Sequence, residues 1–272
     1  MPATESSTNL PHAEAVRALH DLTGRVALIT GGGSGLGRAM AWGLACHGAE
    51  IIIVDRDQSS GAAAANWIAG GSGRRAVSLS ADLSQEMEVN NVCREALDAF
   101  GRVDVLVNNA GHNIRKPLVE YSTAEFDSLH AVHVRGAFLF CRALAPHMRD
   151  RRRGSIINIA SMLGQVGAPN VGAYAAAKAA VAQLSRVLAL EMAVDGVRVN
   201  AIAPGYIDTP LTRQHTPEIR ERICSTTPLG RYGEPHELIG PVLFLASDAS
   251  AFVTGSVLTV DGGWTAGYAR EF

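Results

Sequence analysis

The sequence has few cysteines, and they are not arranged to bind a metal ion. Cys46, Cys93, Cys141 and Cys224 are far apart in the chain. None forms a Cys-x-x-Cys pair, and none has a histidine at the spacing of a zinc site. We therefore predict no metal site. Isolated cysteines are typical of a reducing compartment, where they serve as small core or surface residues.

Long hydrophobic runs are also absent. No stretch approaches the 18 or so apolar residues that span a membrane. The first 24 residues lack the apolar core of a signal peptide. We expect the first dozen residues to be disordered and residues 13–20 to form a short helix. Together these features predict a cytoplasmic protein with no membrane partner.

The sequence carries no surplus of positive charge. Its net charge is −2 and its pI is about 6.5, whereas a surface for nucleic acid or an anionic membrane is basic. The one basic run, residues 149–154, lies between an apolar helix and an apolar strand and is interpreted as a solvated loop. We therefore expect a small-molecule substrate and no nucleic-acid partner.

Short apolar runs alternate with helical patterns along the chain. The predicted strands are residues 26–30, 51–55, 76–80, 103–108, 155–160, 197–203 and 256–261. The predicted helices are residues 35–47, 59–69, 85–100, 123–150, 172–194 and 234–247. The strand runs are almost entirely apolar, which indicates burial on both faces. This order predicts an α/β fold: a doubly wound, seven-stranded parallel sheet with helices on both faces.

The chain shows no internal boundary. No linker rich in glycine, proline or serine divides it, and no repeat is visible. We predict a flexible N-terminal extension over residues 1–21 and a single domain over residues 22–272. In a doubly wound sheet, ligands bind outside the carboxyl ends of the strands, so the residues that follow each strand are the candidate site residues.

A glycine-rich loop, "TGGGSGLG", follows the first predicted strand. Glycines there permit a tight turn into a helix and a close approach of a pyrophosphate to backbone N–H groups. The spacing is G-x-x-x-G-x-G rather than G-x-G-x-x-G, but a purely structural turn would not need five glycines in seven residues. The predicted cofactor contacts in this loop are Gly31, Ser34, Gly35, Leu36 and Gly37.

Asp55 ends the second predicted strand. A carboxylate there accepts hydrogen bonds from the ribose hydroxyls of NAD and repels the 2′-phosphate of NADP. Arg56 follows it and would attract that phosphate, while Ser34 is not basic. We give Asp55 the greater weight and favour NAD, with NADP as the alternative.

Further contacts are expected after the third and fourth strands. Asp82, with Leu83 beside it, can meet the adenine edge, or it can act in a helix N-cap region; both roles are compatible. Small residues after the fourth strand would let the dinucleotide pass. The contacts predicted there are Asn109, Ala110 and Gly111.

The chemistry is predicted to lie with Ser161, Tyr174 and Lys178. Tyr174 and Lys178 are four residues apart and so share one face of a helix. A phenol has a free pKa of about 10, and we expect the ammonium group of Lys178 to lower it so that Tyr174 exchanges protons near neutral pH. Ser161 follows the fifth strand and can hydrogen-bond the same substrate oxygen.

These motifs resemble those of the short-chain dehydrogenase/reductase family. "TGGGSGLG", "NNAG" at 108–111, Ser161 with "YAAAK" at 174–178, and "PG" at 204–205 match its pattern over residues 22–265. The resemblance implies a Rossmann-type domain, hydride transfer with NAD or NADP, and a homotetramer. It implies that Tyr174 is the general acid/base, that Lys178 orients the nicotinamide ribose and that Thr209 holds the carboxamide. The remaining cofactor contacts that it implies are Tyr174, Lys178, Pro204, Gly205 and Ile207.

His133 stands where this family often has Asn. In the family that residue supports a water molecule through its backbone carbonyl, and a backbone role survives substitution of the side chain. We therefore expect an active enzyme. The alternative for His133 is simple packing or a helix hydrogen bond.

The substrate is predicted from resemblance to gluconate 5-dehydrogenases and 2-deoxy-gluconate 3-dehydrogenases. "AIAPGYIDTPLT" and "VDGGW" carry part of that resemblance. Arg115, with Lys116 beside it, would supply the cation for a sugar-acid carboxylate; a solvent-facing loop is an equally good interpretation. Residues 212–223 resemble the mobile substrate lid of the family. The predicted substrate contacts are Arg115, Ser161, Gln165 and Tyr206.

Three functions are compatible with these features. The first is an NAD-dependent dehydrogenase of sugar acids or polyols. The second is a 3-oxoacyl-carrier-protein reductase, a branch that favours NADPH, against which Asp55 argues. The third is a non-catalytic dinucleotide-sensing protein, but such proteins commonly lose the tyrosine or lysine that this sequence retains.

Overall fold

The computed structural model describes residues 11–267. The disorder expected over the first dozen residues falls mostly on residues 1–10, which lie outside this range. Within it, the short helix expected at 13–20 is present, as α1 (Ala13–Arg17) followed by a 3-10 turn (Ala18–His20). No helix among the described residues combines the length and the apolar character that crossing a bilayer requires.

The predicted fold is confirmed: seven parallel strands form one sheet in the order β3-β2-β1-β4-β5-β6-β7. Strands β2 and β3 are added on one side of β1, and strands β4 to β7 are added on the other side. This change of side between β1 and β4 creates the crevice where doubly wound sheets bind ligands. The observed bounds agree with the predicted ones to within two residues. The strands are β1 (Val26–Thr30), β2 (Glu50–Asp55), β3 (Ala76–Ser80), β4 (Val105–Asn108), β5 (Gly154–Ile159), β6 (Val197–Pro204) and β7 (Val257–Val260).

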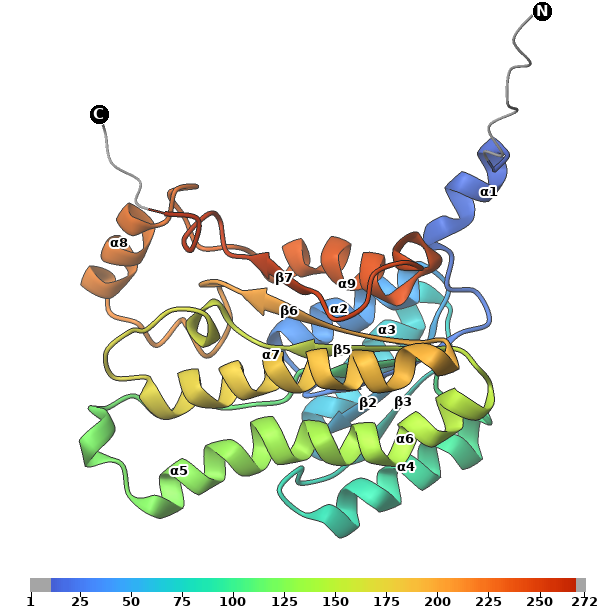
Figure 1. The fold of residues 1–272 in the computed structure, drawn as a ribbon, viewed down its shortest axis with the longest axis horizontal. Coiled ribbons are helices and arrows are strands. Elements are labelled where there is room, and N and C mark those ends of the chain that lie inside the picture. Colours follow the sequence, from blue (N-terminus) through green and yellow to red (C-terminus); the bar gives the residue numbers. More distant parts are fainter. Residues whose placement is uncertain (1–10, 268–272) are drawn as a thin grey trace, which may run out of the picture.

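Helices cover both faces of this sheet (Figure 1). One face carries α2 (Gly35–Cys46), α3 (Gln58–Ser72) and α9 (Ile239–Ala246). The other carries α4 (Glu86–Phe100), α6 (Ala137–Asp150) and α7 (Gly172–Met192). Successive strand residues enter different cores: Ile51 and Ile53 pack toward α2 and α3, whereas Ile52 packs toward α4 and α6. This alternation explains why the strand runs are apolar at every position.

The helix predicted over residues 123–150 is interrupted. It consists of α5 (Thr123–His130), a π-helical turn (Ala131–Gly136) and α6. Ser122 and Glu125 form a capping box that starts α5. An extra residue in a helical turn is frequent at functional sites, and here the π turn carries His133. Similarly, the helix predicted from residue 234 begins as a 3-10 turn (Pro235–Leu238) before α9.

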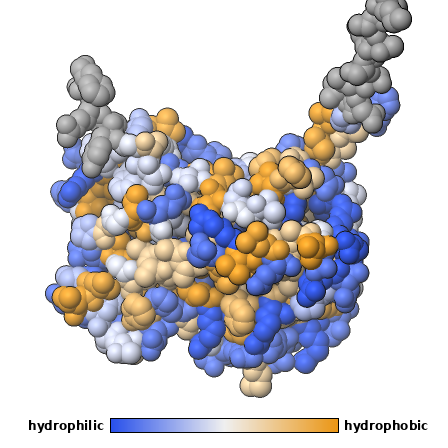
Figure 2. Space-filling view, in the orientation of Figure 1, coloured by the Kyte–Doolittle hydropathy of each residue, from blue (hydrophilic) through white to orange (hydrophobic). Residues whose placement is uncertain are grey.

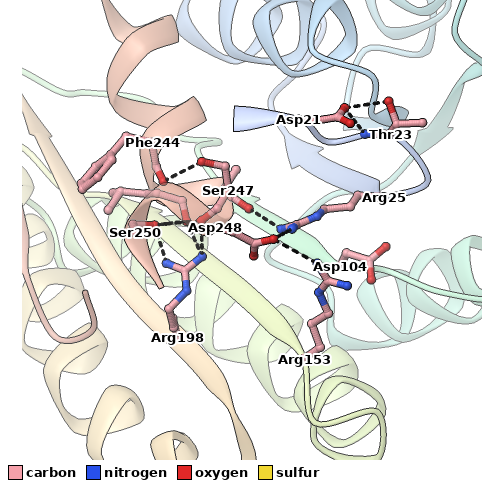
Figure 3. A network of polar contacts seen from close by, with 12 residues as sticks. Asp21, Thr23, Arg25, Asp104, Arg153, Arg198, Phe244, Ser247, Asp248 and Ser250 are labelled. Carbon is pink, nitrogen blue, oxygen red and sulfur yellow. Dashed lines mark hydrogen bonds and ion pairs between the residues drawn. The ribbon is translucent and has the colours of Figure 1, made fainter. Parts of the chain in front are cut away.

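A polar network joins elements at the amino ends of the strands, which is the edge opposite the one where a ligand is expected (Figure 3). Arg25 pairs with Asp248 at 2.6 Å and donates to the carbonyl oxygen of Ala246 at 3.1 Å. Arg198 donates to Ser250 Oγ at 2.7 Å, and burial lowers the pKa of Arg198 to about 10. These contacts join the starts of β1 and β6 to the end of α9, so this edge is fixed and the opposite edge is left for binding.

Candidate active site

A cavity of about 670 Å³ lies along the carboxyl edge of the sheet. Its walls are formed by the loops after β1 to β6, by the π-helical turn and α7, and by one residue of the helix α8 (Pro217–Thr226). It brings together every residue that the sequence nominated for the site except Gly37 and Gln165. No cluster of three or more metal-ligating side chains occurs within residues 11–267.

Gly37 and Gln165 do not line this cavity. A Cβ atom at Gly37 would overlap the carbonyl oxygen of Gly31, so glycine there permits α2 to pack closely against the loop. Gln165 Nε2 instead donates a hydrogen bond to Thr259 Oγ1 on β7 at 3.0 Å. The structure therefore places Gly37 in a packing position and turns Gln165 away from the cavity.

The glycine-rich loop has the form of a phosphate-binding turn. Gly31 and Gly35 adopt φ angles of 65° and 52°. Residues that carry a Cβ atom rarely adopt such positive angles. Ser34 is the N-cap of α2 but makes no side-chain capping hydrogen bond. The first N–H groups of a helix have no intrahelical partner and attract anions. These features fit the diphosphate of a dinucleotide.

Asp55 is held in a fixed position at the end of β2. Its Oδ2 accepts a hydrogen bond from the backbone N–H of Gly33 at 2.9 Å, and its Oδ1 accepts one from Asp57 at 3.0 Å. Arg56 also lines the cavity. Asp82 accepts a hydrogen bond from the backbone N–H of Ser84, which lowers the pKa of its carboxyl. Both predicted ribose determinants, Asp55 and Arg56, therefore face the same cavity.

Ser161, Tyr174 and Lys178 converge at the centre of the cavity. Ser161 follows β5 and accepts a hydrogen bond from the backbone N–H of Leu163 at 3.1 Å. Lys178 is only 5% exposed, and its Nζ donates to the carbonyl oxygen of Ile159 at 2.7 Å. This Nζ lies 5.7 Å from the centroid of the Tyr174 ring. The arrangement can move a proton to or from a substrate oxygen.

The pKa expected for Tyr174 is corrected by the structure. Burial raises the pKa of its phenol, and the hydrogen bond with Ser161 opposes this only in part. Lys178, whose Nζ lies 5.7 Å from the ring centroid, does not outweigh this effect of burial on the phenol. Burial lowers the pKa of Lys178 to about 7. Near neutral pH, Lys178 is therefore the member of the pair that titrates in this structure.

The side chain of His133 forms part of the cavity wall. Its Nε2 donates a hydrogen bond to the carbonyl oxygen of His112 at 2.7 Å, and its ring meets the Tyr174 ring edge-on at 5.4 Å. A Cβ atom at Gly111 would overlap the imidazole. Burial first, and then the charge of Lys178, lower the pKa of His133 far below its usual range. The alternative that the sequence left open for His133, a packed and hydrogen-bonded side chain, therefore describes its contacts here.

Arg115 and Tyr206 lie at the outer end of the cavity. Nη1 of Arg115 approaches Nε2 of His215 to 3.4 Å. Lys116, in contrast, forms an ion pair with Glu125 at 2.5 Å and does not line the cavity, so Arg115 is the cation that faces it. Sequence reasoning missed several wall residues because they lie in loops without periodicity: His112, Asn113, Met162, Leu211, Gln214 and His215.

The predicted lid forms a loop and the helix α8. Thr216 caps α8, and Ile219 contributes to the cavity wall. Asp208, at the start of this segment, pairs with Arg213 at 3.1 Å and with Arg220 at 3.2 Å. One carboxylate thereby ties the loop and α8 together through two of the arginines of this segment.

Comparison with known sequences finds dehydrogenases and reductases that match most of this chain. A family model described as Enoyl-(Acyl carrier protein) reductase matches residues 31–265. Gluconate 5-dehydrogenase of Gluconobacter oxydans is 36% identical over 91% of this chain and 97% of its own. The 2-dehydro-3-deoxy-D-gluconate 5-dehydrogenase of Escherichia coli is 40% identical over 90% and 97%. A 3-oxoacyl-acyl-carrier-protein reductase of Thermotoga maritima is 37% identical over 89% and 98%.

Solved structures of dehydrogenases also match most of this chain. A gluconate 5-dehydrogenase from Burkholderia cenocepacia in complex with NADP and tartrate superposes with a TM-score of 0.89, at 38% identity over 93% of this chain and 99% of its own. A short-chain type dehydrogenase/reductase from Mycobacterium marinum gives 0.89 at 35% identity over 93% and 100%. The chain therefore belongs to the short-chain dehydrogenase/reductase family, and it is an oxidoreductase that acts on CH–OH groups with NAD or NADP as acceptor.

Proposed function

We propose that this protein is an NAD-dependent dehydrogenase that interconverts a secondary alcohol and a ketone in a sugar acid or polyol. The observation that carries this proposal is the placement of Ser161, Tyr174 and Lys178 in one cavity with Arg115 at its outer end. The first three residues supply proton transfer, and Arg115 supplies a cation for a carboxylate.

The proton steps follow from the positions of these side chains. In the reducing direction, Tyr174 donates its hydroxyl proton to the carbonyl oxygen of the substrate while Ser161 donates a hydrogen bond to the same oxygen. The raised pKa of Tyr174 keeps the phenol protonated for this step. In the oxidising direction, the Tyr174 phenolate takes the proton from the alcohol, and Lys178 stabilises that phenolate. When bound, the dinucleotide supplies or accepts the hydride.

The preference for NAD rests on Asp55. Its carboxylate is fixed by two backbone N–H groups at the point where the second strand meets the cavity. A fixed charge repels a 2′-phosphate more effectively than a mobile one, since it cannot turn away. Arg56 works in the opposite direction, and the structure from Burkholderia cenocepacia carries NADP. Direct comparison of the two dinucleotides is therefore part of the test.

A sugar-acid substrate is supported by the outer end of the cavity. Arg115 faces it without an acidic partner within 4 Å among residues 11–267. The relatives from Gluconobacter oxydans and Escherichia coli are named for gluconate derivatives, and the Burkholderia cenocepacia structure holds tartrate, a hydroxy acid. The relative from Thermotoga maritima favours a second candidate, reduction of a 3-oxoacyl carrier-protein substrate.

A homotetramer is the assembly that we propose. An apolar band crosses the face of the molecule over α7 (Figure 2). Val187, Leu190 and Val194, in α7 and the turn that follows it, are 43%, 81% and 74% exposed. Association through this helix would bury them, and a two-fold axis would pair the same surface on two subunits.

Substrate screening tests the proposed function. Polyols, sugar acids and a 3-oxoacyl thioester are offered with each dinucleotide, and the nicotinamide absorbance is followed. We expect turnover of at least one sugar acid or polyol with NAD. Turnover confined to the 3-oxoacyl thioester with NADPH would establish the second candidate instead.

A further inference from the structure

Arg115 and His215 meet at the outer end of the cavity although 100 positions separate them in the chain. Arg115 belongs to the loop after β4, and His215 belongs to the segment between β6 and α8. Both line the cavity, and Nη1 of Arg115 lies 3.4 Å from Nε2 of His215. A ligand that reaches Arg115 from the cavity therefore also reaches His215.

The hydrogen bonds of His215 define its tautomer. A guanidinium group contains only donors, so Nε2 of His215 accepts from Arg115. The ring proton then lies on Nδ1, which is 3.0 Å from the hydroxyl oxygen of Tyr232 and donates to it. Tyr232 is 5% exposed, and the guanidinium of Arg220 lies 4.3 Å from its ring centroid. His215 is thus neutral, and its orientation is fixed by a buried partner.

The groups that face His215 from the neighbouring elements carry positive charge or none. Arg115 faces it from the β4 loop and Arg220 from α8, while the rings of Tyr206 and Tyr232 lie 6.2 and 6.3 Å from its own. Burial lowers the pKa of His215, and Arg115 and Arg220 lower it further.

Negative charge near this histidine is already engaged. Asp208 pairs with both Arg213 and Arg220. Within residues 11–267, no carboxylate lies within 4 Å of Arg115 or His215. The site therefore presents a guanidinium charge and a titratable imidazole, and it has no anion of its own.

We propose that the carboxylate of the substrate binds between Arg115 and His215, and that His215 takes up one proton from solvent as the carboxylate binds. This inference rests on the proposed sugar-acid function and adds a second recognition residue to it. The carboxylate replaces the contact between the two side chains. One oxygen accepts from Arg115, and the other accepts from the new N–H at Nε2 of His215.

The proton uptake follows from charge and geometry. A negative charge beside an imidazole favours its protonated form. Nδ1–H continues to donate to Tyr232, so the protonation requires no rearrangement on that side of the ring. Affinity for an anionic substrate should fall as pH rises above the pKa of the free histidine, by at most about ten-fold per pH unit. A neutral polyol should show no such dependence at this site.

Titration calorimetry measures the proton directly. D-gluconate is titrated into the enzyme with bound NADH at pH 7, in two buffers that differ in ionisation enthalpy. The difference in heat gives the number of protons taken up. We expect between about half a proton and one proton per gluconate. His215→Gln keeps a neutral hydrogen-bonding side chain and should abolish the uptake, whereas His236→Gln, at an exposed histidine away from the cavity, should leave it unchanged.

Two contrary results are distinguishable. If gluconate binds and is oxidised but its heat is the same in both buffers, the histidine changes tautomer instead of charge, and the inference is wrong while the proposed function stands. If no sugar acid binds or is oxidised with either dinucleotide, the proposed function fails and the inference fails with it. A second measurement compares kcat/KM for D-gluconate with kcat/KM for the neutral polyol D-glucitol. Titration of Tyr174 or Lys178 affects both values, so its effect cancels in their ratio. This ratio should fall as pH rises in the wild type and should not fall in His215→Gln.

Discussion

Lys178 and Tyr174 face each other one helical turn apart on α7, with Nζ 5.7 Å from the centroid of the phenol ring. The lysine is buried, and its Nζ also donates to the carbonyl oxygen of Ile159. Burial of an ammonium group is unfavourable unless an anion accompanies it. The active site therefore contains a residue that serves chemistry at the expense of stability.

The stability of the protein should depend on pH through Lys178. Its pKa is about 7 in the folded protein, below the value of 10.5 expected in the unfolded chain. Between these values the unfolded chain binds more protons, so the free energy of unfolding should rise with pH, by at most about 1.4 kcal/mol per unit. Lys178→Met should remove this dependence and should gain most over the wild type at pH 6.

Urea unfolding of both proteins from pH 6 to pH 9.5 checks this. The stability difference between wild type and Lys178→Met should shift steadily in favour of the wild type as pH rises through 7. A difference that stays constant over this range would show that the ammonium group is not destabilised in the folded protein. Lys178→Met should also lose turnover, because the charge that stabilises the phenolate is gone.

Cofactor choice should depend on Asp55. We expect kcat/KM with NAD to exceed that with NADP by at least ten-fold, or about 1.4 kcal/mol. Asp55→Asn keeps an acceptor for one backbone N–H but loses the charge, so it should narrow the gap by improving the use of NADP. Asp55→Ala removes both acceptors and should weaken NAD as well. Equal use of both dinucleotides by the wild type would overturn the assignment.

Gly111 and His133 should be energetically coupled. Gly111→Ala places a Cβ atom against the imidazole and should destabilise the wild type by about 1–3 kcal/mol. In a His133→Asn background the same change should have a smaller effect, because the shorter side chain leaves room. Unfolding free energies of the four proteins of this cycle give the coupling, and additive effects would mean that the two side chains do not touch.

Assembly should depend on the exposed face of α7. Light scattering at micromolar concentration should give about four times the chain mass of 28.6 kDa. Leu190→Glu should reduce the mass, whereas Met87→Glu on α4, at 74% exposure, provides a matched control that should not. A monomeric mass for the wild type would refute the tetramer.

Much of this architecture could be predicted from sequence because local patterns carry it. Residues that alternate between two cores, such as Ile52 and Ile53, are apolar at every step, and the glycines of the first loop have φ angles that favour glycine. The cavity residues nominated after each strand follow from the topology alone. These signals depend on the backbone and on spacing, which the sequence displays directly.

Other features depend on contacts between distant residues. The meeting of Arg115 with His215, and the pairing of Lys116 with Glu125, arise from loops that have no periodicity. Gly37 lies in the glycine-rich motif and Gln165 shortly after Ser161, but their surroundings use the first for packing and turn the second away from the cavity. The pKa of Tyr174 was predicted in the wrong direction because spacing reports the neighbouring charge and not the burial.

The central claim is that Tyr174 transfers the substrate proton, and Tyr174→Phe tests it most directly. The variant keeps the ring that packs against His133 and removes only the hydroxyl. On the best substrate found, turnover should fall at least about a hundred-fold, while the Kd for NAD should stay within about two-fold of the wild-type value, a difference below 0.5 kcal/mol. Near wild-type turnover in Tyr174→Phe would contradict the mechanism and leave Tyr174 an ordinary helix residue.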